Sequence, residues 1–126
     1  MRIVSTDESS SEIMGVDGAH GVALRVLIGR EDGAPNFAMR HYTVDPAGHT
    51  PLHRHNYEHE IFVLAGTGMV QSNDTYRGIR PGQAILVPAN ELHQIKNTGD
   101  IPLQFICLVP KEFDCGGGVC QPTPGT

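Results

Sequence analysis

Residues 53–60 read HRHNYEHE, so three imidazoles and two carboxylates lie within eight consecutive positions. Both kinds of side chain are common ligands of divalent metal ions, and a site that keeps open positions can activate what binds there. The stretch therefore predicts a metal site. Which of these side chains bind the ion depends on how the chain presents them.

The alternation of side chains along an extended chain groups the first two histidines. His53 and His55 project to the same side and can share one ion, whereas Arg54 points the other way. Asn56 and Tyr57 then read as a bend.

Beyond this bend, the stretch HEIFVLA (59–65) favours histidine over carboxylate as the next ligand. His59 shares a strand face with the apolar Ile61, while Glu58 and Glu60 fall on the opposite face. If the apolar face is the interior, His59 points toward the ion and both carboxylates point away.

His93 is the fourth candidate, and it can reach the site only through the fold. Each imidazole would bind in its neutral form through one ring nitrogen, with the other nitrogen held by an acceptor. A single buried histidine is more often an ordinary hydrogen-bonded core residue. Four in this arrangement favour a metal site.

Short β-branched and apolar runs, separated by glycine and proline, indicate that an all-β fold positions these side chains. Turn signals include 45–48 (DPAG) and 72–74 (SND), and no segment shows a long helical period. A small closed or sandwiched barrel would hide the strand edges. The predicted strands are 22–28, 37–44, 59–66, 68–72, 83–88, 93–97 and 103–110.

With 126 residues, the chain is long enough for one domain. We expect an N-terminal tail or arm over 1–20, a barrel over 21–112 and a C-terminal tail over 113–126. Cys115 and Cys120 flank GGGV in the last segment and could close a disulfide or clip a metal, although a flexible tail is the favoured interpretation.

Two predicted strands, IFVLA and AILV, are apolar on both faces. One face lines the barrel, so the other needs a cover. We favour a homodimer. The alternative is that the chain's own N-terminal strand covers this face.

The charge pattern and hydropathy limit the other partners. A net charge of -5 and scattered basic residues offer no stripe for nucleic acid. The polar, acidic start does not resemble a signal peptide, and no apolar run approaches the roughly 20 residues that span a bilayer. We expect a cytoplasmic protein that binds a small molecule, with no nucleic-acid or membrane partner.

Two stretches of the chain resemble the two motifs of the cupin family. The resemblance implies a double-stranded β-helix, a jelly-roll-like barrel with a metal inside, bound by His53, His55, His59 and His93. Most cupins have glutamate where this chain has His59, and Asn90 replaces a usual glycine, although asparagine tolerates a left-handed backbone. The matching residues are Gly48, His53, His55 and Gly66 in the first motif, and Gly82, Pro88, His93 and Asn97 in the second.

A narrower resemblance is to the small four-histidine manganese cupins of thermophile type, over about residues 22 to 112. Its matching stretches are RVLIGREDGAPNFAMR, EHEIFVLAG and FICLVPKE. It implies manganese as the ion, and oxidative alkene cleavage with a peroxide. By ligand chemistry alone, iron, copper, nickel or zinc also suit imidazoles.

The predicted pocket around the ion is mainly apolar. The resemblance places Arg40, Phe105 and Cys107 near the ion, with Arg40 and Cys107 as candidate catalytic residues. Arg40 could orient a carboxylate, but an arginine is as often at the surface. Cys107 reads more readily as a small buried hydrophobe than as a nucleophile. The expected substrate-pocket residues are Tyr42, Ile61, Phe105 and Val109.

Four neutral ligands leave the ion's charge undiminished, which makes the site electrophilic. We therefore favour an oxygenase or oxidase, dependent on manganese or another redox metal, that acts on a small apolar or aromatic substrate with dioxygen or peroxide. One alternative is a non-catalytic module that binds a carboxylate or sugar acid. Another is a metal-dependent isomerase, for which the predicted pocket lacks an evident acid–base pair. Whether the protein is an enzyme stays open at this point.

Overall fold

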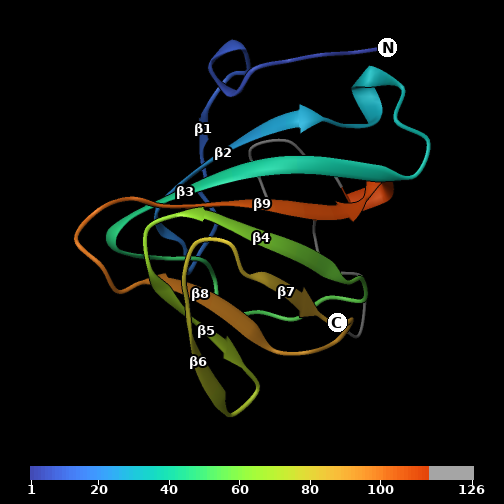
Figure 1. Cartoon of the computed structure of the whole chain (residues 1–126). Coiled ribbons are helices and arrows are strands. Elements are labelled where there is room, and N and C mark those ends of the chain that lie inside the picture. The colour runs from blue at the N-terminus through green and yellow to red at the C-terminus, as the bar shows by residue number, and fades with distance from the viewer. Residues whose placement is uncertain (114–126) are drawn as a thin grey trace.

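The computed structural model describes residues 1–113 and shows a strongly curved β-sheet (Figure 1). Helical structure in this part is limited to the short 3-10 segments η1 (Thr6–Glu8), η2 (Arg30–Asp32) and η3 (Lys111–Phe113). The all-β prediction is confirmed. Cys115 and Cys120, and nearly all of the predicted C-terminal tail, lie outside the described residues. The strands are β1 (Glu12–Ile13), β2 (His20–Ile28), β3 (Phe37–His49), β4 (His59–Ala65), β5 (Gly68–Ser72), β6 (Thr75–Ile79), β7 (Ala84–Val87), β8 (His93–Asn97) and β9 (Leu103–Pro110).

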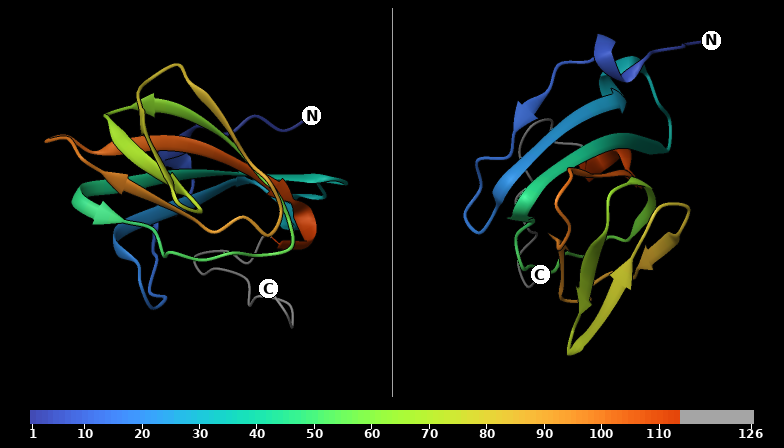
Figure 2. Two further views of the ribbon diagram at one scale, coloured as in Figure 1. Left: turned by 90° about the horizontal axis from the view of Figure 1, so that it is seen from below. Right: turned by 60° about the vertical axis from the view of Figure 1, so that its left-hand side comes forward.

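The sheet follows the order β6-β5-β8-β3-β9-β4-β7, with β2 added to β3 and β1 added to β2. Strand β3 belongs to both halves of the barrel. Its first part pairs with β9, from Phe37 opposite Pro110 to Val44 opposite Leu103, and its last residue, His49, pairs with Lys96 of β8. The sheet therefore curls around a common interior (Figure 2), as the predicted jelly-roll-like barrel requires.

Strict alternation of side chains fills this interior. In β4, His59, Ile61 and Val63 are buried while the residues between them are exposed, as the sequence pattern predicted. In β9, every second residue from Leu103 to Val109 is at most 3% exposed. Among residues 1–113, no helix is long and apolar enough to cross a membrane.

The predicted turn at 45–48 is wrong, because these residues form a corner inside β3. Ala47 has a positive φ of 66°, and a Cβ on Gly48 would lie 2.6 Å from the His20 carbonyl oxygen. The register of β2 on β3 also shifts between His20 and Val22. A strand that turns a corner can pair with β9 before the bend and with β8 after it.

Two strands are absent from the sequence prediction. Strand β6 pairs with β5 through a hairpin at Asn73, whose φ is 50°. Four of its five residues are exposed, so it carries no apolar alternation. Strand β1 pairs with β2, and Met14 just after it is 5% exposed in the core. Part of the segment predicted as an N-terminal tail therefore packs on the barrel.

Within residues 1–113, the outer face of β4 and β7 exposes three large apolar side chains beside Glu60. Phe62, Leu64 and Leu86 are 46%, 44% and 61% exposed. The alternative in which the N-terminal strand covers this face is wrong, because β1 pairs with the edge of β2. The homodimer remains a prediction, and this face is where we expect it.

The double variant Phe62→Glu/Leu86→Glu should convert a wild-type dimer to a monomer, because carboxylates are disfavoured in the apolar centre of an interface. Light scattering coupled to gel filtration, over a range of concentrations, measures the mass. Tyr76→Glu is the matched control, since Tyr76 is 58% exposed on β6, outside this face. A wild-type protein that is monomeric at every concentration would contradict the prediction.

Candidate metal centre

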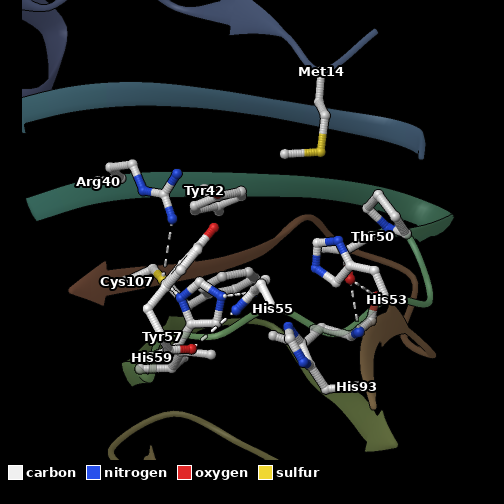
Figure 3. Close-up of a pocket in the computed structure, with 14 residues that line it drawn as sticks. Met14, Arg40, Tyr42, Thr50, His53, His55, Tyr57, His59, His93 and Cys107 are labelled. Atoms are coloured by element: carbon white, nitrogen blue, oxygen red, sulfur yellow. Dashed lines mark hydrogen bonds between the residues drawn. The ribbon is translucent and has the colours of Figure 1, made fainter. Parts of the chain in front are cut away.

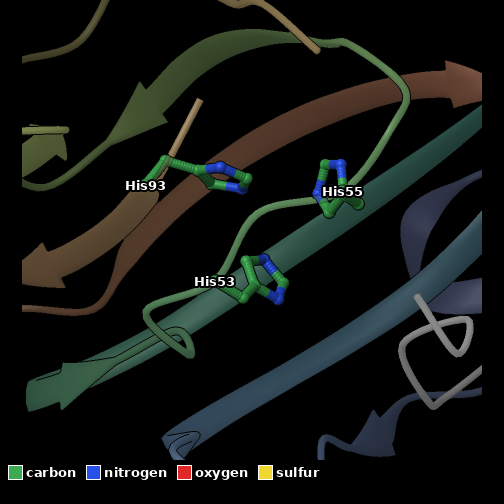
Figure 4. Close-up of side chains that lie close together, drawn as sticks. All are labelled: His53, His55 and His93. Atoms are coloured by element: carbon green, nitrogen blue, oxygen red, sulfur yellow. The ribbon is translucent and has the colours of Figure 1, made fainter. Parts of the chain in front are cut away.

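His53, His55 and His93 place their ligand atoms within 4.8 Å of one another (Figure 4). His53 lies in the loop between β3 and β4, and His93 begins β8. Two backbone hydrogen bonds join them: His53 N–H donates to His93 O at 3.1 Å, and His93 N–H donates to His53 O at 2.9 Å. This bridge fixes the distance between two ligands that are far apart in the sequence.

Backbone carbonyls set the ring orientation of two ligands. His55 Nδ1 lies 2.9 Å from Tyr57 O, and His93 Nδ1 lies 2.9 Å from Glu91 O. A carbonyl only accepts, so each Nδ1 carries the proton and each Nε2 keeps its lone pair. Neutral imidazoles held in this way fit a divalent metal ion.

Asn90 holds the loop that carries His55. Its N–H donates to His55 O at 2.7 Å, and its φ is 68°, in the left-handed region. Asparagine tolerates this backbone better than most residues. The prediction that asparagine preserves this turn in place of glycine is confirmed.

His59 is next to the triad rather than within it. Its Nε2 lies 2.7 Å from His55 Nε2, and its ring centroid is 5.2 Å from that of His93. Two nitrogens that share one ion stand roughly 3 Å apart at bond lengths of about 2.1 Å. The distance from His59 to His55 suits a shared ion, but in the described part of the chain the ligand atoms that all lie within 4.8 Å of one another belong to His53, His55 and His93 alone. Glu58 and Glu60 are exposed, as the strand alternation predicted.

Burial keeps the imidazoles neutral. Burial, and then the neighbouring His93 and His55, lower the pKa of His53 to about 3. Burial and His93 lower the pKa of His55 to about 4. The pKa of His59 is also well below its ordinary value, mainly through burial. These rings present lone pairs instead of protons to a metal ion at neutral pH.

The histidines open into a pocket with a cavity volume of ≈ 40 Å³ (Figure 3). Of the pocket residues expected from the sequence, Val109 is not in the lining and lies in the core instead, 1% exposed. The expected residues that do line the pocket are Arg40, Tyr42, Ile61, Phe105 and Cys107; the lining also contains Met14, Thr50, Pro51, Tyr57 and Ile95, which sequence reasoning missed.

Tyr57 is the most consequential of the missed residues. Its ring stacks on His55 with centroids 3.9 Å apart and planes 5° apart. Tyr57 lies an even number of positions from each of His53, His55 and His59. Side-chain alternation alone therefore predicts that it shares their face. The predicted bend at Asn56 and Tyr57 is confirmed, but it leaves the Tyr57 ring on the interior side.

Arg40 and Cys107 lie behind His59. Cys107 Sγ is 3.1 Å from His59 Nδ1, and one Nη of Arg40 donates to the same sulfur at 3.8 Å. Arg40 is 2% exposed, so the alternative of a surface arginine is wrong. The expectation that no base flanks Cys107 is wrong, because His59 Nδ1 is in contact with its sulfur. Cys107 is nevertheless buried, and burial raises the pKa of its thiol, which agrees with a small buried residue that supports His59.

The family model described as "Cupin_2: Cupin domain" matches residues 40–109, which contain the four candidate ligand histidines. The chain belongs to this family. The cupin resemblance inferred from the two motifs is thereby confirmed, and three histidines are placed where one ion could bind, as in cupins generally.

Several known proteins are similar over much of this cupin. The polyketide cyclase RemF from Streptomyces resistomycificus is 31% identical with a TM-score of 0.83, over 98% of this chain and 82% of that chain. A predicted oxalate decarboxylase from Thermotoga maritima is 26% identical with a TM-score of 0.77, over 87% of this chain and 99% of that one. The 1-methylthio-D-xylulose 5-phosphate methylsulfurylase of Rhodospirillum rubrum is 30% identical over 60% of this chain and 49% of that enzyme.

We expect His59→Glu to retain one bound metal ion, because a carboxylate oxygen can replace the imidazole at the same place. His59→Leu removes the donor and should weaken metal binding at least about tenfold. Elemental analysis and competition with a chelator measure both. Glu60→Gln, on the exposed face of the same strand, is the control. Loss of metal from His59→Glu with the fold intact would count against His59 as a ligand.

The metal-free protein should lose stability as the pH falls from about 6.5, the ordinary pKa of histidine, toward about 3. In this window the unfolded chain binds protons that folded His53, with its pKa of about 3, does not. Melting temperatures of wild type and His53→Gln across this range measure the effect. The melting temperature of His53→Gln should fall less than that of wild type over this range. His20→Gln, a change at an exposed histidine, should behave like wild type. Parallel decline of all three proteins would contradict the assignment.

Proposed function

We propose that this cupin is a metal-dependent enzyme that binds a small substrate through a carbonyl oxygen and stabilises negative charge on that oxygen. The observation that carries the proposal is the charge of the pocket. Its lining combines four imidazoles with one guanidinium and contains no carboxylate. With a metal ion bound, such a site disfavours a cationic substrate and favours an enolate or a similar oxyanion.

His53, His55 and His93 would hold the ion, with His59 as the fourth ligand. A divalent ion held there by neutral ligands supplies Lewis acidity toward a carbonyl oxygen. The imidazoles contribute their orientation, which the Tyr57 and Glu91 carbonyls fix before any ligand binds. Little reorganisation would be needed when the ion enters.

Tyr57 supplies the proton donor that the sequence-predicted pocket lacked. Burial raises the pKa of its hydroxyl, although the positive charge of Arg40 opposes this. Tyr57 therefore stays protonated near neutral pH and can donate to a developing oxyanion. Figure 3 shows its side chain reaching from His55 toward Arg40.

The similarity to RemF, a polyketide cyclase, supports this class of reaction, because cyclisation of a polyketide proceeds through activated carbonyl groups. The similarity to the predicted oxalate decarboxylase from Thermotoga maritima also supports a substrate that presents carboxyl oxygens to the ion. The shared element is an oxyanion next to carbon. Cyclisation, isomerisation and decarboxylation differ in which bond is formed or broken at that carbon.

Oxidation with dioxygen or peroxide, favoured by the four-histidine manganese resemblance, is the second candidate. Ile61 and Phe105, 4% and 2% exposed, give the pocket a dry apolar wall suited to an apolar or aromatic substrate. Manganese is the ion that this candidate favours. A non-catalytic binding module remains the outcome if neither reaction occurs.

One metal-replacement experiment separates the three possibilities. The metal-free protein receives manganese, iron, copper or zinc, and each form is assayed for exchange of carbon-bound hydrogen of hydroxyacetone in D₂O, by NMR. If the protein activates a carbonyl group, we expect hydrogen exchange with zinc as well as with manganese, and little exchange without metal. Tyr57→Phe should lower the exchange rate while metal stoichiometry stays unchanged.

The same metal-loaded forms are then given styrene and hydrogen peroxide. Oxidation would replace carbonyl activation as the proposed function under one result. That result is cleavage of styrene with manganese, iron or copper but not zinc, together with no hydrogen exchange. Stoichiometric metal without turnover in either assay would indicate a binding module.

A further inference from the structure

Arg40 is a buried cation without a carboxylate partner. It is 2% exposed, and its Nε has no hydrogen-bond partner. The only ion pair among residues 1–113 joins Arg2 to Asp32. A guanidinium stays charged at any physiological pH, and an isolated buried charge is costly. Arg40 therefore lacks the counter-charge that a buried arginine normally has.

The contacts of Arg40 within the protein compensate this charge only in part. Its guanidinium carbon lies 5.4 Å from the centroid of the Tyr42 ring, and the hydrogen bond to Cys107 is made to a weak sulfur acceptor at 3.8 Å. Burial acts to lower the pKa of Arg40, but nearby Tyr42 and Cys107 outweigh it, so the pKa is raised. The site keeps the cation charged.

Arg40 faces the same pocket as the histidines. Figure 3 shows it on the side of the pocket away from His53 and His93, with Tyr57 and His55 between them in this view. Its positive charge contributes to the lowered pKa values of His53 and His55. A ligand bound at the histidines would therefore lie in the field of Arg40.

We propose that Arg40 determines specificity for an anionic substrate, whose carboxylate or enolate oxygen accepts hydrogen bonds from the guanidinium. Another oxygen of the same molecule would face the histidines. The inference rests on the proposed metal-dependent function, and it adds the substrate class: a small molecule with two neighbouring oxygen groups, at least one of them anionic.

The shape of the pocket favours a planar anion over a tetrahedral one. Its cavity of ≈ 40 Å³ has room for on the order of three water molecules. The wall beside Arg40 is flat, because the Tyr42 and Phe105 rings stack with centroids 5.0 Å and planes 7° apart. A carboxylate fits such a slot and matches the planar fork of a guanidinium. A phosphate group is bulkier in every direction.

The test uses zinc-loaded protein, since zinc is redox-inert, and compares binding of pyruvate with that of its neutral amide, pyruvamide, by calorimetry. Arg40→Met keeps much of the side-chain length without the charge. It should weaken pyruvate binding about ten- to hundredfold, the range for a lost charge-assisted hydrogen bond. Pyruvamide binding should change less than about threefold. Arg54→Gln is the matched control, because Arg54 is exposed one residue from two of the ligands.

Two further measurements show whether Arg40 acts in substrate specificity or only supports the structure: the pyruvate affinity of Arg40→Lys and the melting temperature of Arg40→Met. Arg40→Lys keeps the charge without the planar fork, so its affinity for pyruvate should fall between those of wild type and Arg40→Met. Removing an unpaired buried charge should leave the melting temperature of the ligand-free protein equal or higher. If Arg40→Met does not fold, the pyruvate and pyruvamide comparison is made with Arg40→Lys.

Equal weakening of both ligands, or no weakening of pyruvate, would overturn the proposal. Inorganic phosphate that binds more tightly than pyruvate, and loses this affinity in Arg40→Met, would overturn the planar-anion assignment. Zinc content is measured first. If wild type binds no zinc, the proposed function fails on its own, and the pyruvate titration of metal-free wild type and Arg40→Met still decides the role of Arg40.

Discussion

The pair of backbone hydrogen bonds between His53 and His93 is the constraint on which the site depends. It fastens the loop after β3 to the start of β8, so two ligands on distant segments share one location. Thr50 extends the connection, because its N–H donates to Ile95 O at 2.9 Å and its Oγ1 accepts from Ile95 N–H at 2.9 Å. The loop is thereby held almost as a strand. Without these bonds the histidines would lie on independent segments, and ordering them around an ion would cost conformational entropy.

A second constraint is that the interior contains positive charge and almost no means of neutralising it. Burial holds His53 and His55 neutral, and Arg40 remains charged beside them. A carboxylate ligand in place of His59 would have given the centre a negative charge to offset the ion and Arg40. With imidazole there, any compensating charge has to arrive with the substrate. The ligand set, the buried arginine and the preference for an oxyanion are thus parts of one electrostatic arrangement.

Side-chain alternation predicted much of this centre, because barrel strands have one inner and one outer face. It placed His59 and Ile61 inside and Glu58 and Glu60 outside, as the structure does. The same rule, continued across the bend at Asn56 and Tyr57, would also have placed Tyr57 inside. Strand β6 could not be found in this way, because a hairpin edge exposed over most of its length has no apolar face. The corner in β3 was also missed, since Asp45 to Gly48 has the composition of a turn, and only the pairing of β2 with Val44 before it and His49 after it shows that the strand continues.

Distances between motifs were beyond the reach of sequence reasoning, because they depend on the closure of the sheet. Val109 illustrates the limit: it shares a strand face with Phe105 and Cys107, but the pocket ends before it. The most direct test of the account is a crystal structure of the metal-loaded protein, with anomalous scattering to locate the ion. The account predicts one ion bound through Nε2 of His53, His55, His59 and His93, with no carboxylate from the chain. An ion bound by Glu58 or Glu60, or bound by three histidines while His59 keeps its hydrogen bond to His55, would contradict it.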